Sequence, residues 1–504
     1  MSNQVELKKT LGLTGVTVNA MALIAPGAFL WLTFQLQAAQ VKTSGGTTAM
    51  DIFPGMVFAI IITFLTAVSY SKLAENYPES GTGSSYYFAE RSFMNEDSLS
   101  LLTRVIKFVV GWFSHLYYWV YPGVMVGMGA ILINYIAVQF EVSIPVYAQA
   151  ILAVLIAFLT GAVAYMGVRG STTLSLIINV IQITTLVFIT VLALIYRFTN
   201  PDHVQFVHTN LLSVVIPHSF SAVLFQSTIA ILLFVGFESA TALNAESKSV
   251  RNVSRGVILS LVLQGVAFYL FEYLGTLSFI NTSYNAGGKT GFEAAGASSA
   301  PIGDMVKILG DRLLHNSGFG LMILAAVSVA ISLFGTTLAC MNTGIRITYA
   351  MAKDNEVPSV FGVLNIKHAT PHTAVLVITI VSAVIGAFSV FSVRNLTAVA
   401  FISNIGTFIL YGMTNLIAFV AFLRRPGRNV ITYAIVPVLG MIANLVMLFS
   451  VMYLGIKGGG ETRDSAFIAI VFSAVWFLIG IIYLIYNSSK TNRRILYDKN
   501  IIDI

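Results

Sequence analysis

Twelve apolar runs, each close to the length that crosses a membrane, constrain the fold of this chain more than any other feature. The hydrocarbon core of a bilayer is about 30 Å thick, and an α-helix needs about 20 residues to span it. The runs cover residues 11–38, 52–71, 106–138, 144–167, 172–196, 221–246, 256–280, 318–345, 373–393, 396–423, 430–456 and 465–487. They predict an all-α polytopic protein with twelve transmembrane helices in the lipid bilayer.

Composition agrees with a membrane protein. Of the 504 residues, 57% are hydrophobic and 10% are charged, whereas soluble domains contain about 25% charged residues. The net charge of +7 does not indicate a nucleic-acid partner, because the basic residues lie between the apolar runs, where they are typical of membrane topology. We therefore expect no binding to nucleic acid.

The sequence contains no pattern typical of an enzyme. The single cysteine, Cys340, excludes an intrachain disulfide and a cysteine-based metal cluster. Motifs for phosphate binding, metal-dependent hydrolysis and a Ser-His-Asp triad are absent. We therefore expect no catalytic residues, no metal site and no cofactor.

The positions of lysine and arginine predict the orientation of the chain. With the N-terminus in the cytoplasm, most of the 28 Lys and Arg residues fall in cytoplasmic segments, as the positive-inside rule requires. An even number of spans returns the C-terminus to the same side. We expect a multi-pass protein of the plasma membrane with both termini in the cytoplasm, and the oligomeric state stays open.

Two of the runs are interrupted by residues that weaken a helix. The first contains Ala25-Pro26-Gly27, where proline removes a backbone hydrogen bond and glycine lowers helix preference. The sixth contains Gly236 followed by the charged Glu238. One such break could be a simple proline kink, but paired breaks five spans apart are typical of transporters built from inverted repeats. Half-helix N-termini favour anions and free carbonyls favour ammonium groups, so the pair predicts a mid-membrane site for a zwitterion.

Three motifs in the chain carry a resemblance to a known protein family. They are Lys72–Tyr87, Phe234–Ser239 followed by Glu246, Arg251 and Arg255, and Asn342–Pro358 followed by Thr370-Pro371-His372. In this order and spacing they resemble the amino acid–polyamine–organocation (APC) superfamily, and with the twelve runs the resemblance covers nearly the whole chain.

The resemblance implies an architecture and a set of substrate contacts. The fold would be a LeuT-like five-plus-five inverted repeat in a transport core of residues 1–423, with repeats at about 11–196 and 221–423. Residues 424–504 would form helices 11 and 12 and a short cytoplasmic tail. Spans 1 and 6 would be unwound. The implied contacts to a substrate carboxylate are Ile24, Ala25, Gly27 and Ala28, and those to its amino group are Phe234, Val235 and Phe237.

The resemblance also implies a function. We expect a secondary active transporter that moves amino acids by alternating access, with proton-coupled symport or exchange. Pro26 offers no N–H to a carboxylate, which keeps open a polyamine or amine importer and an amino acid–amine antiporter. A membrane nutrient sensor with the same fold is a further alternative.

Ionisable groups inside a membrane are costly and are functional candidates by default. Glu238 is a candidate gate or partner for a cationic substrate or proton, with a helix-end residue as the structural alternative. Glu272 could carry a proton or face the outer vestibule, and His115 could sense pH or simply pack. Gln182 occupies the position at which some proton-coupled relatives place a lysine, so that proton switch would be absent.

Hydroxyl groups in the eighth run suggest one further ion site. Ser332, Thr336 and Thr337 could bind sodium together with carbonyls of span 1, as in sodium-coupled members of this fold. Serine and threonine also join helices routinely in membranes. A proton is therefore the favoured coupling ion, and sodium is the alternative.

Overall fold

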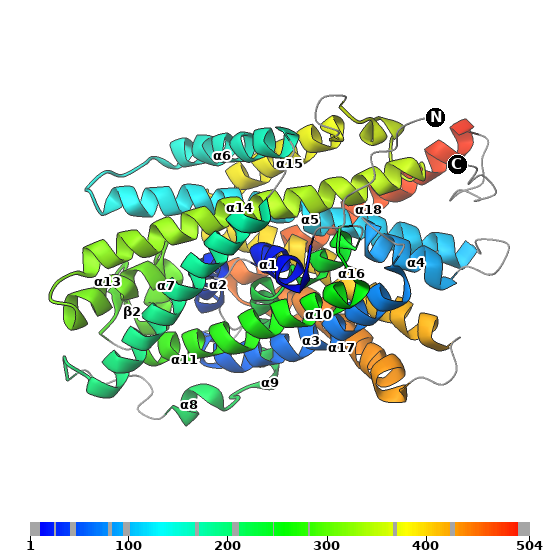
Figure 1. Cartoon of the computed structure of the whole chain (residues 1–504). Coiled ribbons are helices and arrows are strands. Elements are labelled where there is room, and N and C mark those ends of the chain that lie inside the picture. The colour runs from blue at the N-terminus through cyan, green and yellow to red at the C-terminus, as the bar shows by residue number, and fades with distance from the viewer. Residues whose placement is uncertain are drawn as a thin grey trace.

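The computed structural model describes residues 11–24, 27–40, 47–78, 83–93, 101–166, 171–203, 211–244, 246–280, 283–365, 370–423 and 429–491. These residues form a bundle of helices that run mostly side by side (Figure 1). The first half contains α1 (Leu13–Ile24), α2 (Ala28–Ala38), η1 (Ala49–Asp51), α3 (Ile52–Asn76), α4 (Ser85–Phe93), α5 (Leu101–Val138), α6 (Val146–Met166), α7 (Ser171–Thr199) and α8 (Leu212–Val215).

The middle of the chain contains the most irregular helices and a small hairpin. Its elements are α9 (Phe220–Ala230), the 3-10 helices η3 (Ile231–Leu233) and η4 (Phe237–Leu243), α10 (Val250–Leu261), the π-helix η5 (Val262–Tyr269), α11 (Leu270–Phe279), β1 (Asn285–Ala286), β2 (Lys289–Thr290), α12 (Gly291–Ala297) and α13 (Pro301–Leu313). The remainder contains α14 (Gly318–Lys353), η6 (Ser359–Gly362), α15 (His372–Ser389), α16 (Val393–Leu423), η7 (Ile431–Ile435), α17 (Val436–Lys457) and α18 (Gly460–Thr491).

Eleven helices of the described chain are long and apolar enough to cross a membrane. They correspond to the second to twelfth runs of the sequence. The first run appears as α1 and α2, of 12 and 11 residues, and neither is long enough to span the hydrocarbon core by itself. The protein is therefore a polytopic helical membrane protein in which one expected span is divided.

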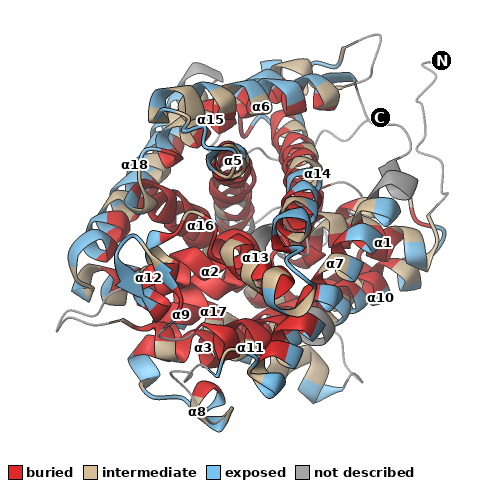
Figure 2. Cartoon of the chain, turned by 90° about the vertical axis from the view of Figure 1, so that its left-hand side faces the viewer, coloured by how far each residue is buried: buried red, intermediate tan, exposed pale blue. Residues whose placement is uncertain are grey.

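The helices differ in how far the rest of the bundle covers them. In the apolar part of the helical segment Phe220–Leu243, 89% of residues are buried, against 22% in α6 and 17% in the last span. Figure 2 shows buried ribbon in α2, α9 and α16 at the centre, with α6, α15 and α18 at the periphery. Exposed apolar side chains on α6 and α18, such as Leu155 and Ile482, fit a surface solvated by lipid.

The segment between α11 and α14 packs onto the bundle through its two helices. Gly296 of α12 lies so close to the end of α2 that a Cβ on it would be 2.8 Å from the Ala39 Cα. Asp304 of α13 accepts hydrogen bonds from Tyr135 of α5 at 2.9 Å, from Tyr284 at 2.9 Å and from Ser298 at 2.6 Å. These contacts fix α12 and α13 over one end of the divided first span.

A polar cluster holds the opposite, predicted cytoplasmic end of the bundle. The Lys107 ammonium of α5 lies 2.7 Å from Glu90 of α4 and 2.5 Å from Asp354 after α14. Tyr86 also donates a hydrogen bond to Asp354 at 2.9 Å. Burial raises the pKa of the neighbouring Glu356 to about 7, although the Lys107 charge opposes this shift.

Glu356 should make the stability of this end depend on pH. Between its ordinary pKa of 4.5 and about 7, the folded protein holds a proton that the unfolded chain releases, so the stabilisation is lost as pH rises through this range. We expect the melting temperature of wild-type protein to fall relative to that of Glu356→Gln as pH increases across this window. Melting curves in detergent measure this difference, with the exposed Glu293→Gln as control. Equal pH slopes for wild type and Glu356→Gln would contradict the prediction.

Candidate functional site

Both predicted interruptions are breaks in the helices, and each contains a glycine in the left-handed region. α1 ends at Ile24 and α2 begins at Ala28, preceded by Gly27 with φ 87°. In the sixth span, η3 ends at Leu233 and η4 begins after Gly236, whose φ is 122°. Residues with a Cβ rarely adopt such angles, which explains why glycine stands at both positions.

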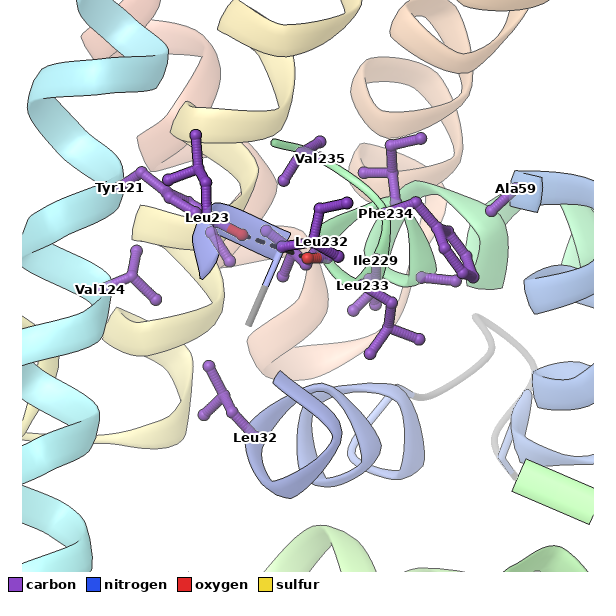
Figure 3. Close-up of a cluster of buried hydrophobic side chains, with 14 of the residues drawn as sticks. Leu23, Leu32, Ala59, Tyr121, Val124, Ile229, Leu232, Leu233, Phe234 and Val235 are labelled. Carbon is purple, nitrogen blue, oxygen red and sulfur yellow. Dashed lines mark hydrogen bonds between the residues drawn. The ribbon is translucent and has the colours of Figure 1, made fainter. Parts of the chain in front are cut away.

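The two breaks lie against each other. A Cβ on Gly236 would be 2.8 Å from the Ile24 nitrogen and 2.9 Å from the Leu23 carbonyl carbon. Figure 3 shows Leu23 beside the segment that carries Leu232 and Val235. Two stretches more than 200 residues apart in the sequence are thus in backbone contact in the core of the bundle.

The structure brings together those predicted substrate contacts that it describes. Ile24, Phe234, Val235 and Phe237 are all fully buried at these breaks, and Gly27 precedes α2. Ala25 lies outside the described residues. For Ala28 the structure gives the backbone, as the first residue of α2.

Glu238 lies directly behind the second break and accepts three hydrogen bonds. Tyr118 of α5 donates to its Oε1 at 3.0 Å, and Tyr411 of α16 donates to its Oε2 at 2.7 Å. The Gly236 amide also donates to Oε2, at 2.9 Å. The side chain is 1% exposed, so a buried carboxylate is held at the break by hydrogen bonds, and its role as a gate or substrate partner stays a prediction.

Side chains also satisfy carbonyl groups of the second break. Tyr121 donates to the Leu232 carbonyl at 3.1 Å, and the Ser239 hydroxyl donates to the Gly236 carbonyl at 2.6 Å. Backbone groups without partners are costly in hydrocarbon. These bonds therefore allow the chain to leave the α-helix at this depth.

Aromatic rings cover one side of the break. Phe237 packs edge-on against Tyr70, with ring centres 5.7 Å apart, and its ring lies at a tilt to that of Tyr411, with ring centres 5.4 Å apart. The contacts of the Phe237 ring in this conformation are thus tyrosines of the second and tenth runs. Tyrosine hydroxyls and faces can bind a cationic group.

Glu272 of α11 lies near the other break and has a different environment. It is 1% exposed, and neither carboxyl oxygen has a hydrogen-bond partner among the described residues. It lines a small cavity together with Gly27, Gln182 and Ser328. The Gln182 amide nitrogen donates to the backbone carbonyl of Ser328 and to its hydroxyl.

The remaining coupling candidates occupy packing positions. His115 stacks on Trp119 at 4.5 Å and contacts the Thr348 hydroxyl at 3.2 Å. Thr336 bonds to the Ala22 carbonyl of α1 at 3.1 Å. Thr337 bonds to its own helix at the Leu333 carbonyl, and the buried Ser332 contributes its carbonyl to Thr336. The structure thus joins the eighth span to the first through one hydroxyl.

Sequence reasoning missed several polar contacts around the breaks. Gln37 of α2 and Gln226 of α9 exchange amide-to-carbonyl bonds of 3.4 and 3.0 Å, and Tyr273 donates to the Gln37 side chain at 2.6 Å. The contribution of Tyr411 from the tenth run was also not foreseen. The available signal was the presence of glutamines and tyrosines inside strongly apolar runs.

Comparison with known proteins decides the family. Residues 9–492 match the model of the amino acid permease family. The chain belongs to the amino acid permease family. The permease is therefore a membrane transporter and not an enzyme, as the sequence predicted.

Three relatives illustrate the range of the family around this permease. The low-affinity putrescine importer PlaP of Escherichia coli K12 is 23% identical, over 96% of the permease and 94% of PlaP. The branched-chain amino acid permease BcaP of Bacillus subtilis is 23% identical, over 98% and 96% of the two chains. A putative arginine/ornithine antiporter of Bacillus subtilis is 29% identical, over 32% of the permease and 30% of the antiporter.

The contact between the breaks yields a test by substitution. Gly236→Ala should destabilise the permease, because a left-handed residue costs about 1–3 kcal/mol without glycine and the new Cβ would also collide with Leu23 and Ile24. Gly288→Ala is the matched control, since Gly288 also has a positive φ but nothing within 4 Å of its added Cβ. Thermal unfolding in detergent should show the larger loss for Gly236→Ala. Equal losses would mean that the breaks do not pack as described.

Proposed function

We propose that the permease transports small molecules that carry an amino group, amino acids or amines, and that they bind where the two breaks meet. The observation that carries this proposal is the buried Glu238 carboxylate beside the Gly236 break, hydrogen-bonded by neutral groups and paired with no cation among the described residues. A substrate ammonium group would supply the missing positive charge. The three relatives described above are named for putrescine, branched-chain amino acids, and arginine and ornithine, and all of these compounds contain an amino group.

The first break would distinguish amino acids from amines. A substrate carboxylate would bind near the N-terminal end of α2, where Gly27 and the first residues of the helix offer backbone N–H groups to an anion. The implied contacts are Ile24, Ala25, Gly27 and Ala28. Pro26 removes one possible donor, which supports the amine alternative beside the amino-acid one.

Transport would proceed by alternating access in an inverted-repeat core. Spans 1, 2, 6 and 7 would rock against spans 3, 4, 8 and 9 around the fixed site. An ion pair joins the two groups of spans at one end of the bundle. Arg346 of α14 lies 3.2 Å from Glu246, which follows η4. Breaking such a contact would open the predicted cytoplasmic side. The permease would lie in the plasma membrane with both termini in the cytoplasm.

Transport by the purified protein tests the proposal. Liposomes containing the permease and loaded with leucine, arginine or putrescine should take up the labelled compound by counterflow, and uptake should saturate. Competition between arginine and its decarboxylated amine separates the two substrate classes, because only the amino acid needs a carboxylate pocket. The absence of counterflow with amino acids and amines of all three kinds would refute the proposed function.

Glu238→Gln should reduce counterflow by at least about tenfold, since losing the charge removes a buried ion pair with the substrate. The isosteric amide keeps acceptor capacity for one tyrosine, so the variant should still fold. Glu293→Gln, an exposed acid on α12, is the control and should transport like wild type. Unchanged uptake by Glu238→Gln would remove this residue from the substrate site.

A further inference from the structure

A second buried carboxyl group has no part in the proposed substrate site. Glu272 is 1% exposed, and both of its oxygens are without hydrogen-bond partners in the described part of the chain. An ionised carboxylate without a donor or a cation is costly inside a membrane. In this conformation the group therefore requires a proton or a bound cation.

The carboxyl group lines a cavity of limited size. The cavity lies between α2, α7, α11, α13 and α14 and includes Gly27, Trp31, Gln182 and Ser328. The volume in which the centre of a water molecule can lie is about 10 Å³. A cavity needs roughly 10–15 Å³ of such volume to hold one water. There is room for about one water but not for an amino acid or a diamine.

The polar neighbours in the cavity do not neutralise a charge. The Gln182 amide nitrogen is bonded to Ser328, and its oxygen faces Gly27, since a Cβ on that glycine would be 2.6 Å away. A glutamine cannot take up a proton near neutral pH. The cavity thus holds the uncharged Gln182 amide beside the Glu272 carboxyl group.

No described cation faces Glu272 from the helices packed around it. The cavity residues of α2, α7, α13 and α14 include no Asp, Glu, Lys, Arg or His. α3 has none between Ile52 and Ser71, and α8 has none. On its own span the titratable neighbours are Tyr269, which bonds the Gly27 backbone, and Tyr273, which bonds Gln37 at 2.6 Å.

We propose that Glu272 is a proton-binding site that couples the permease to the proton gradient. The inference rests on the proposed function and adds its coupling ion. In the conformation described here, which we take as the closed state, Glu272 is 1% exposed and has no hydrogen-bond partner among the described residues, so the neutral, protonated form is favoured. When α2 moves away to open the site, water reaches Glu272 and stabilises the ionised carboxylate. Proton binding therefore favours the closed state, because a ligand shifts an equilibrium by its difference in affinity for the two states.

Gly27 links the proton to the substrate. It is in the cavity wall beside Glu272, and it also belongs to the break proposed to receive the substrate carboxylate. Any substrate that draws this break closed also closes the cavity over Glu272. By linkage, a proton should then raise substrate affinity and the substrate should raise proton affinity by the same factor, about 5- to 150-fold for a typical coupling.

Proton uptake on substrate binding tests the proposal directly. Calorimetric titrations of the purified permease with leucine, arginine and putrescine, each in two buffers that differ in ionisation enthalpy, give the number of protons taken up. We expect wild type to take up a proton on binding and to bind more weakly at high pH. Glu272→Gln should bind with an affinity that does not change with pH and should take up none. Glu293→Gln should behave as wild type.

The outcomes separate this inference from the proposed function. Two results would overturn the proton site and leave the transport proposal intact. In the first, wild type binds substrate without taking up a proton. In the second, Glu272→Gln takes up as many protons as wild type. Sodium-dependent binding that is lost in Glu272→Gln would also overturn the proton site and assign the cavity to sodium. No binding or counterflow with any of the three compounds would refute the proposed function itself. If Glu272→Gln does not fold, Glu272→Asp replaces it as the test variant. This variant keeps a carboxyl group, so it should still take up a proton, but the pH dependence of its substrate affinity should be displaced from that of wild type. An unchanged pH dependence would contradict the proposal.

Discussion

The contact between two broken helices is the interaction on which the rest of this structure depends. A helix that unwinds inside a bilayer releases backbone groups that no lipid can satisfy. Here Gly236 allows the sixth span to pack its backbone directly on Leu23 and Ile24 of the first. Side chains of other spans, among them Tyr121, then bond to the released groups. The breaks are stable because they meet in the best-buried part of the bundle.

The two buried glutamates show how environment divides one residue type between two roles. Glu238 accepts hydrogen bonds from two tyrosines and a backbone amide, and we propose that it binds the ammonium group of a substrate. Glu272 has no donor among the described residues and lies beside a cavity for about one water. We propose that the first of these sites binds a cationic substrate and the second a proton. Glu238 bonds to the second break and Glu272 lines a cavity with Gly27 of the first, and the two breaks are in contact, which would provide a physical route between substrate and ion.

The sequence predicted the features that arise locally. Apolar run length predicted the spans, and proline and glycine predicted where the first and sixth would break, because these residues act through their own backbone. The division of the first span into two short helices followed from the same residues. The inverted-repeat arrangement remains a prediction from resemblance.

Contacts made by tertiary packing could not be predicted. Tyr411 lies 173 residues from Glu238, and nothing in the spacing shows that their side chains meet. The lack of a partner for Glu272 is likewise visible only when every neighbouring helix is in place. The stack of His115 on Trp119 is a further contact that sequence could not show, and its role as a pH sensor stays a prediction.

If the two breaks together form the substrate site, as we propose, a structure of the permease with bound substrate will show the ligand between them. Electron cryomicroscopy of the permease in lipid nanodiscs with saturating arginine or putrescine would locate the ligand. We expect density between α1–α2 and residues 232–238, with the ligand amino group within hydrogen-bond distance of Glu238 or the adjacent carbonyls. Ligand density elsewhere in the bundle, with both breaks unchanged and unoccupied, would contradict it.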